Sequence, residues 1–320
     1  MTTMRDVAKK AGVGVGTVSR ALSDTGYTAK ATREKILAAA DARGYDYESA
    51  AKAHVKPITI GIMLPLLRHP FFSRMTDSIE TELHQRGYRC LIFDNCNNTI
   101  QQREAIDMLE ENIINGLIAL GDPPPDFTGR NGKAIVSMDR RWGESVPMVH
   151  SDHAQGGRLA AEAFLESGCR RIIQFMGGNL GATLNARHTA LEKTLRSNDC
   201  QVTSVQTPWN FMGYSYDRNV VRDYWNVIRD MDGCMTNDVA ALSCLSIALE
   251  MGVDVPGQLR IIGYDGTEIT RLSHPELSVI EQDCPALAVA CVNRLVELLE
   301  GKPAERETII PVIWKKRGTT

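Results

Sequence analysis

The sequence predicts a small all-α segment at the N-terminus, followed by an α/β body of two doubly wound parallel-sheet lobes. Two observations lead to this expectation. Residues 1–45 contain short helical patterns and no strand pattern, whereas from residue 58 onward short apolar runs alternate with amphipathic stretches. Such alternation is typical of parallel sheets with crossover helices. A chain of 320 residues is long enough for more than one domain.

Three short helices are predicted in the N-terminal segment. Thr3 and Asp6 have the spacing of a capping box, with Asp in place of the usual Glu or Gln, and Gly12 and Gly44 are placed to end helices. The predicted helices are one that runs up to Gly12, one over 17–22 and one over 31–43. A polar connector follows and ends at Pro57.

The body is expected to hold roughly five strands in each of two sheets. Strands are predicted over 58–64, 90–93, 116–120, 134–138, 171–176, 233–235 and 259–264. Helices are predicted over 72–86, 100–111, 154–166, 186–196, 239–251 and 285–299. Ligands of such folds lie at the carboxyl ends of the strands, so polar residues that follow a predicted strand are candidates for a binding site.

Composition excludes several classes of protein. No run of 18 apolar residues occurs, and residues 1–10 lack the apolar core of a secretory signal, so we expect a cytoplasmic protein. The eight cysteines are scattered without a C-x-x-C pair, which predicts buried thiols, no disulfide framework and no metal site. Residues 1–56 hold ten Lys and Arg against six Asp and Glu, and the remainder holds 26 against 33. A basic head on an acidic body weakly favours a polyanionic partner for the head.

Residues 4–22 have the spacing of a helix-turn-helix. Small Ala8 allows two helices to approach closely, and Gly12 permits the tight turn between them. The apolar residues expected to lock these helices are Val7, Ala8, Ala11, Val13, Val18 and Leu22. A phosphate-binding loop at 12–16 is disfavoured, because no strand precedes it and no Lys-Ser/Thr follows. A small helical domain that does not act as a helix-turn-helix remains the alternative.

The second helix of this pair would present Val15, Gly16 and Arg20 outward. The guanidinium of Arg20 suits the O6 and N7 atoms of guanine in the major groove, and Val15 suits a thymine methyl. The hydroxyls of Thr17 and Ser19, together with the helix N-terminus, suit phosphates. The spacing therefore predicts a DNA-reading helix.

This head resembles the headpiece of the LacI/GalR family, whose pattern is D-V-A-x-x-A-G-V-S-x-x-T-V-S-R-x-L-N. The matching residues are Asp6-Val7-Ala8, Ala11-Gly12-Val13, Thr17-Val18-Ser19-Arg20, Leu22, Thr32-Arg33 and Gly44-Tyr45. Gly14 stands in place of the family's capping Ser and is a tolerable cap. Gly16 is a poor helix residue and costs roughly 1 kcal/mol.

The body resembles the family's effector domain, which is itself similar to periplasmic sugar-binding proteins. The matching segments, in order, are His69-Pro70-Phe71-Phe72, Ser137-Met138-Asp139-Arg140, Ser151-Asp152-His153, 156–161, Thr236-Asn237-Asp238 and Gly263-Tyr264-Asp265. His153 replaces an Asn of the family pattern, and Gly266 replaces a second Asp. The resemblance therefore covers essentially the whole chain.

A polyol site explains these residue types, because a sugar needs an apolar wall and polar groups that clamp adjacent hydroxyls. The effector-binding residues expected from the pattern are Phe72, Asp139, Thr183, Arg187, Trp209, Asn237 and Asp265. Phe72 and Trp209 would form the wall, and Arg187 and Asp265 would also orient each other. Phe71 and Asp152 are expected to be structural.

The resemblance implies an allosteric repressor, at least a homodimer, in which each head reads half of a pseudo-palindromic double-stranded operator and a small sugar or sugar derivative is the effector. It divides the chain into a headpiece (1–45), a hinge (46–57) and an effector-binding and dimerisation domain (58–320). The lobes are then 58–152 with 283–311, and 153–282 with 312–320.

Two other functions are alternatives for a chain of this kind. A solute-binding protein for transport would need a signal peptide and would not need the head. An enzyme could use Asp139, Asp152 or His153, but no nucleophile–base–orienter set and no metal spacing is present. We therefore expect no catalytic residue, no cofactor and no metal.

The hinge is where this sequence departs most from the family pattern. The family's Pro, Asn and minor-groove Leu correspond to Tyr47, Glu48 and His54. An apolar wedge between base steps offsets an unstacking cost of a few kcal/mol, and imidazole is more polar than a leucine side chain. Glu48 also brings negative charge towards DNA. The sequence therefore predicts a hinge that bends the operator less than is usual in the family.

We expect His54→Leu to increase both operator affinity and DNA bending, because it restores an apolar wedge. Affinity of the parent chain should rise as pH falls from about 8 to 6, through the range in which histidines usually gain a proton. A bending assay on circularly permuted operator fragments measures the first effect. A parent bend as large as that of the variant would contradict the prediction and would indicate Val55 as the wedge.

Overall fold

The structure is a computed structural model that describes residues 2–23, 27–45, 57–95, 98–177, 181–207 and 214–320. The chain divides into two compact units, residues 1–57 and 58–320, which are described separately. The predicted hinge, with His54, and the predicted wall residue Trp209 lie outside the described residues.

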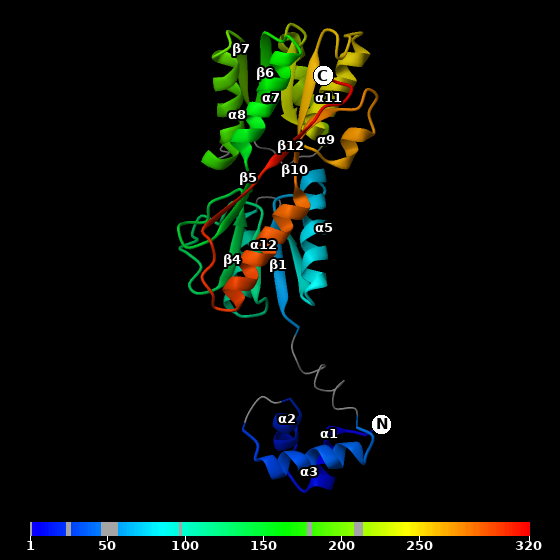
Figure 1. Ribbon diagram of the computed structural model, residues 1–320, viewed down its shortest axis with the longest axis vertical. Coiled ribbons are helices and arrows are strands. Elements are labelled where there is room, and N and C mark those ends of the chain that lie inside the picture. The colour runs from blue at the N-terminus through cyan, green and yellow to red at the C-terminus, as the bar shows by residue number, and fades with distance from the viewer. Residues whose placement is uncertain (1, 24–26, 46–56, 96–97, 178–180, 208–213) are drawn as a thin grey trace. The chain divides into compact units, whose positions relative to one another are not determined.

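The small unit consists of three helices, drawn in dark blue in Figure 1: α1 (Met4–Ala11), α2 (Val15–Ser23) and α3 (Lys30–Asp41). Its core contains Val7, Ala8, Ala11, Val18, Ala21, Ile36, Ala39 and Ala40. The capping box is present, since the Asp6 carboxylate accepts hydrogen bonds from the Thr3 amide at 2.8 Å and from the Thr3 hydroxyl at 2.7 Å. Gly12 ends α1 with a φ of +65°, which favours glycine.

The large unit contains two six-stranded sheets, in the orders β11-β5-β4-β3-β1-β2 and β12-β10-β9-β8-β6-β7. The strands of the first are β1 (Thr59–Leu64), β2 (Arg89–Asp94), β3 (Gly116–Ala119), β4 (Ala134–Met138), β5 (Met148–Ser151) and β11 (Glu307–Ile310). Those of the second are β6 (Arg171–Gly177), β7 (Gln201–Thr207), β8 (Gly233–Asn237), β9 (Arg260–Asp265), β10 (Ser278–Gln282) and β12 (Val312–Lys315). All neighbours are parallel except β10 and β12.

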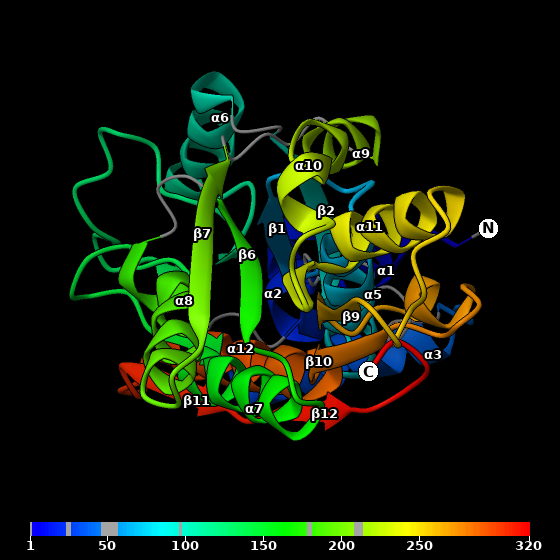
Figure 2. The same cartoon turned by 90° about the horizontal axis from the view of Figure 1, so that it is seen from above.

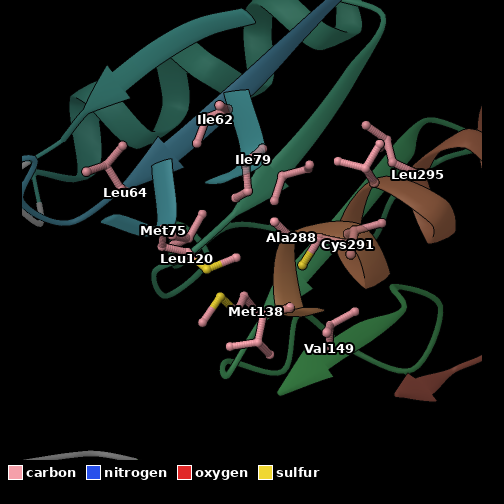
Figure 3. Packing of buried hydrophobic residues seen from close by; sticks show 14 of the residues in the cluster. Ile62, Leu64, Met75, Ile79, Leu120, Met138, Val149, Ala288, Cys291 and Leu295 are labelled. Carbon is pink, nitrogen blue, oxygen red and sulfur yellow. The ribbon is translucent and has the colours of Figure 1, made fainter. Parts of the chain in front are cut away.

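Helices cover both faces of each sheet. In the first lobe, α5 (Pro70–Gln85) and α12 (Cys284–Leu299) share one core, and α6 (Thr99–Glu110) packs on the other face. Figure 3 shows the core shared by α5 and α12, where Met75 and Ile79 of α5 meet Ala288 and Cys291 of α12. In the second lobe, α7 (His153–Glu166) and α8 (Gly181–Arg196) lie on one face (Figure 2). The opposite face carries α9 (Tyr214–Asp223), α10 (Trp225–Ile228) and α11 (Asp238–Glu250).

The chain passes between the lobes three times: from β5 to α7, from β10 to α12, and from β11 to β12. At the first passage Asp152 caps α7, because its Oδ1 accepts from the Gln155 amide at 2.7 Å. Asp152 therefore has the structural role expected of it. These passages join the lobes where β5 and β10 end, at their carboxyl ends.

Two adjacent glycines allow α7 to lie close to its neighbours. A Cβ at Gly157 would lie 2.0 Å from the carbonyl oxygen of Arg187 on α8, and one at Gly156 would lie 2.4 Å from the hydroxyl of Tyr264 on β9. Both contacts are far inside van der Waals range, so only glycine fits at either position. The pair thus fixes how near Arg187 and Tyr264 come to the start of α7.

The predicted cysteine environments are confirmed for Cys244 and Cys291, which are fully buried, and the cysteines in the described part of the chain are free thiols. Among the described residues, no helix combines the length and apolarity that crossing a membrane would require.

Candidate functional site

Helix α2 exposes the predicted reading face. Val15, Gly16 and Arg20 are exposed, with Val15 at 42%, whereas Val18 and Ala21 are buried against α1 and α3. The helix begins at Val15 because the Gly14 carbonyl accepts from the Thr17 and Val18 amides. Thr17 and Ser19 are half-buried at the edge of this face. The contacts of these five residues with DNA remain a prediction.

In the large unit, the strand ends bring together three predicted effector residues. Asp139 follows β4 of the first lobe, Asp265 ends β9 of the second, and Arg187 lies on α8. All three are at least nine-tenths buried, and their charges act on one another. Sequence positions more than 120 residues apart therefore meet at one point between the lobes.

Asp139 is held by a polar chain that crosses between the lobes. His153 Nε2 lies 2.9 Å from Asp139 Oδ1, and His153 Nδ1 lies 3.0 Å from the Tyr264 hydroxyl. Burial opposes ionisation of Asp139, but His153, His150 and Arg187 outweigh it and hold the pKa of Asp139 below its usual value. Asp139 is therefore a buried carboxylate with a hydrogen-bonded partner.

Arg187 is oriented by its neighbours on the second lobe. Its guanidinium lies 4.4 Å from the ring centroid of Tyr264, and its Nε donates to His188 Nε2 at 3.3 Å. His188 Nδ1 lies 2.8 Å from Gln174 Oε1, and burial lowers the pKa of His188 well below its usual value, so its Nε2 is a neutral acceptor. Within the described chain, the Nη groups of Arg187 have no hydrogen-bond partner and are free for a ligand.

The expectation that Arg187 and Asp265 orient each other is corrected. Gln282 Nε2 donates to Asp265 Oδ1 at 2.8 Å, and no hydrogen bond or ion pair joins Asp265 to Arg187 among the described residues. The Nε of Arg187 instead donates to His188, and its guanidinium lies by the ring of Tyr264. Gln282 also accepts from the Ser151 hydroxyl at 2.7 Å. These hydrogen bonds connect Asp265 to the last residues of β10 and β5, after which the chain passes from one lobe to the other.

Two of these acidic residues have an unusual backbone. Asp139 has a φ of +59° and Asp265 a φ of +127°, in regions that non-glycine residues rarely adopt. Each such residue costs about 1–3 kcal/mol and persists only where its surroundings enforce it. Strain at two strand ends that face one cluster marks this point as the candidate site.

Asp265 shares its surroundings with a second buried carboxyl, Asp238. Asp238 Oδ2 accepts from the amide and the hydroxyl of Thr267, both at 2.7 Å, while its buried Oδ1 has no hydrogen-bond partner among the residues that the structure describes. Burial raises the pKa of Asp238 to about 7, and burial together with Asp238 raises the pKa of Asp265 well above its usual value. One carboxylate of the site, Asp139, is therefore ionised, and the Asp238–Asp265 pair tends to keep a proton.

The remaining predicted residues surround this cluster less closely. Asn237 caps α11, because its Oδ1 accepts from the Ala240 amide at 2.9 Å, so only its amide group is left for a ligand. Phe72 is 9% exposed and packs on Phe71 and His69, which places most of its ring in the core. Thr183 lies in the first turn of α8 and is half-buried.

The acid pair predicts a pH-dependent stability. The folded chain keeps protons on Asp238 and Asp265 where the unfolded chain loses them, so the contribution of both groups to stability falls as pH rises above about 4. Asp265→Asn keeps an oxygen for Gln282 and removes one carboxyl. Its gain in Tm over the parent should grow from about pH 5 to pH 8, by roughly 2–4 °C per kcal/mol.

Differential scanning fluorimetry at several pH values measures this gain. Asp107→Asn, on the exposed face of α6, is the control and should leave the pH profile unchanged. A gain in Tm that is constant between pH 5 and 8 would show that folding does not raise the pKa of Asp265.

Family models match the predicted head and the predicted body of the chain. Residues 3–46 match bacterial regulatory proteins of the lacI family, and residues 58–215 match the periplasmic binding proteins and sugar binding domain of the LacI family. Residues 161–320 match a periplasmic binding protein-like domain.

Full-length relatives agree with these matches. The ribose operon repressor of Bacillus subtilis is 31% identical, with 100% of this chain and 99% of that protein covered. The sucrose operon repressor of Streptococcus mutans is 28% identical, with 97% and 96% covered. The crystal structure of the Lac repressor dimer bound to operator and the anti-inducer ONPF has a TM-score of 0.75 and 23% identity, over 99% of this chain and 98% of that one. This chain belongs to the LacI family of bacterial regulatory proteins.

Proposed function

We propose that this chain is a cytoplasmic transcription repressor that binds a pseudo-palindromic operator as a homodimer and responds to a small sugar-like effector between its lobes. One observation carries the proposal: a single chain combines a helix-turn-helix with an exposed reading face and a cluster of strained, buried polar groups at the strand ends of two lobes. The head argues against a transport protein, and the family supports a regulator rather than an enzyme.

The chemistry of the cluster favours a polyol as effector. Asp139 offers a carboxylate acceptor, the Nη groups of Arg187 offer donors, and a protonated Asp265 offers a donor as well as an acceptor. Adjacent sugar hydroxyls need this mixture, because each both donates and accepts. The names of the ribose and sucrose operon repressors support the same class.

Two measurements test the proposal. Selection from a pseudo-palindromic DNA library should recover a specific operator, and a thermal-shift panel of D-ribose, sucrose, other sugars, sugar phosphates and nucleosides should identify an effector that also changes operator affinity. A chain that binds a panel member but no specific DNA would be a solute-binding protein. A chain that binds DNA and whose affinity no small molecule changes would refute effector control.

For the reading face, we expect Arg20→Ala to lower the preference for operator over random DNA by roughly ten- to hundredfold, since a bidentate guanine contact contributes about 1–3 kcal/mol of discrimination. Folding should be unaffected because Arg20 is exposed. Fluorescence anisotropy with specific and random duplexes measures the ratio. An unchanged ratio would mean that Arg20 does not read a base.

For the effector site, we expect Arg187→Ala and Asp265→Ala each to abolish the effector response while operator binding persists. Both side chains lie at the strand-end cluster, in a different unit from α2. Arg196→Ala is the control, because Arg196 lies on the same helix as Arg187 but is paired with Glu192 at the surface. Operator titrations with and without the active panel sugar give the result, and a response retained in both variants would place the site elsewhere.

A further inference from the structure

The turn that begins at Asp265, the last residue of β9, has positive φ angles at two successive residues. Asp265 has a φ of +127° and Gly266 a φ of +73°. A Cβ at Gly266 would lie 2.6 Å from the Cα of Glu281, so the turn packs directly on β10 and requires glycine there. A backbone of this kind keeps its shape only where neighbouring groups hold it.

Three side chains hold this turn, and one of them comes from the other lobe. Gln282 donates to Asp265 Oδ1, and Asp238 accepts from Thr267. The third is Arg74 on α5 of the first lobe, whose Nη1 donates to the Gly266 carbonyl at 2.8 Å and whose Nη2 lies 3.4 Å from Glu281 Oε1. Glu281 is the register partner of Asp265 on β10. Arg74 therefore contacts both the residue that follows Asp265 in the chain and the residue beside it in the sheet.

The place of Arg74 in the chain distinguishes it from the other contacts between lobes. Ser151, His153 and Gln282 lie at or beside the passages from lobe to lobe, where the covalent chain itself keeps the two sides together. Helix α5 instead connects β1 to β2 within the first sheet. The contacts of Arg74 with the 265–267 turn therefore persist only while the lobes keep this arrangement.

We propose that Arg74 is a positioning residue of the effector site, which fixes the 265–267 turn from the opposite lobe and thereby couples the arrangement of the lobes to the geometry of Asp265. The coupling to an effector rests on the proposed function, whereas the contact across the lobes does not. By linkage, a ligand that uses Asp265 in this geometry stabilises the Arg74 contact, and loss of the contact weakens that ligand.

Hydrogen–deuterium exchange of the full chain tests the contact without any effector. The amide of Thr267 donates to Asp238, so peptides that span residues 262–272 report opening of the turn. Arg74→Met should raise exchange there by roughly tenfold, as expected for loss of a charge-assisted hydrogen bond. Arg74→Lys should restore part of the protection.

Arg86→Met is the matched control. Arg86 follows the last residue of the same helix and has a side-chain exposure of 28%, against 27% for Arg74. In the described part of the chain, its side chain bonds to Glu82 and Asn293 alone, both of the first lobe. Arg86→Met should leave the exchange of the 262–272 peptides unchanged, because the hydrogen bonds of Arg86 lie within the first lobe. Unchanged exchange in Arg74→Met, or an equal rise in Arg86→Met, would overturn the proposal.

Two further measurements complete the test. Glu281→Gln weakens the same contact from the second lobe. Combined with Arg74→Met, it should raise exchange by less than the sum of the two single effects; additive effects would show that the two residues act separately.

With D-ribose and sucrose as probes, any affinity that Asp265→Ala removes should fall about tenfold in Arg74→Met and remain in Arg86→Met. Binding unchanged in Arg74→Met would overturn the coupling. If neither sugar binds, the proposal is decided by the exchange result alone, while the effector assignment fails separately.

Discussion

The two lobes are joined by three passages of one chain, and this connection determines where charge can be buried. The passages keep the carboxyl ends of both sheets near each other, so residues that leave β4 and β9 end in a shared environment. A carboxylate in such a place is costly unless charges or donors reach it from several directions. Asp139 of the first lobe receives these groups from His153 and Arg187 of the second lobe, whereas the carboxyl of Asp265 is bonded by Gln282 of its own lobe and Arg74 of the first lobe reaches the adjacent Gly266 carbonyl.

The two sides of the site meet this cost in opposite ways. Asp139 stays ionised because His153 and Arg187 oppose the effect of burial, whereas the Asp238–Asp265 pair has raised pKa values because burial and mutual repulsion favour a shared proton. Carboxyls in different states present different hydrogen-bonding groups to one ligand. A polyol, whose hydroxyls both donate and accept, suits that pairing better than an ion of either sign.

Much of this could be predicted from the sequence, and what could not has a physical reason. The predicted helices and strands followed from periodicity, but helices α9 and α10 and strands β5, β7, β10, β11 and β12 were missed. Strands β7, β11 and β12 are edge strands with partly exposed side chains, and β5 and β10 are short and contain polar residues, so they lack an apolar run. Asp139, Arg187 and Asp265 were expected because they follow strands and match a family pattern. Their partners His153 and Gln282, and the neighbouring Arg74, were not, because a pairing between separate elements leaves no local pattern. The same limit explains why Arg187 was assigned to Asp265 rather than to Tyr264 and His188.

The free energy of allosteric coupling determines how many contacts between the lobes a response to an effector requires. An effector shifts an equilibrium only by its differential affinity for two states, and allosteric coupling free energies are typically about 1–3 kcal/mol. A hydrogen bond to a charged group contributes about 1.5–3 kcal/mol. One contact such as that of Arg74 with Gly266, made in one arrangement of the lobes and lost in another, is therefore of the right size by itself. The contacts that Arg74, Ser151 and His153 make between the lobes are polar. Each of the apolar cores of the body lies within one lobe, so a change in the arrangement of the lobes need not disrupt them.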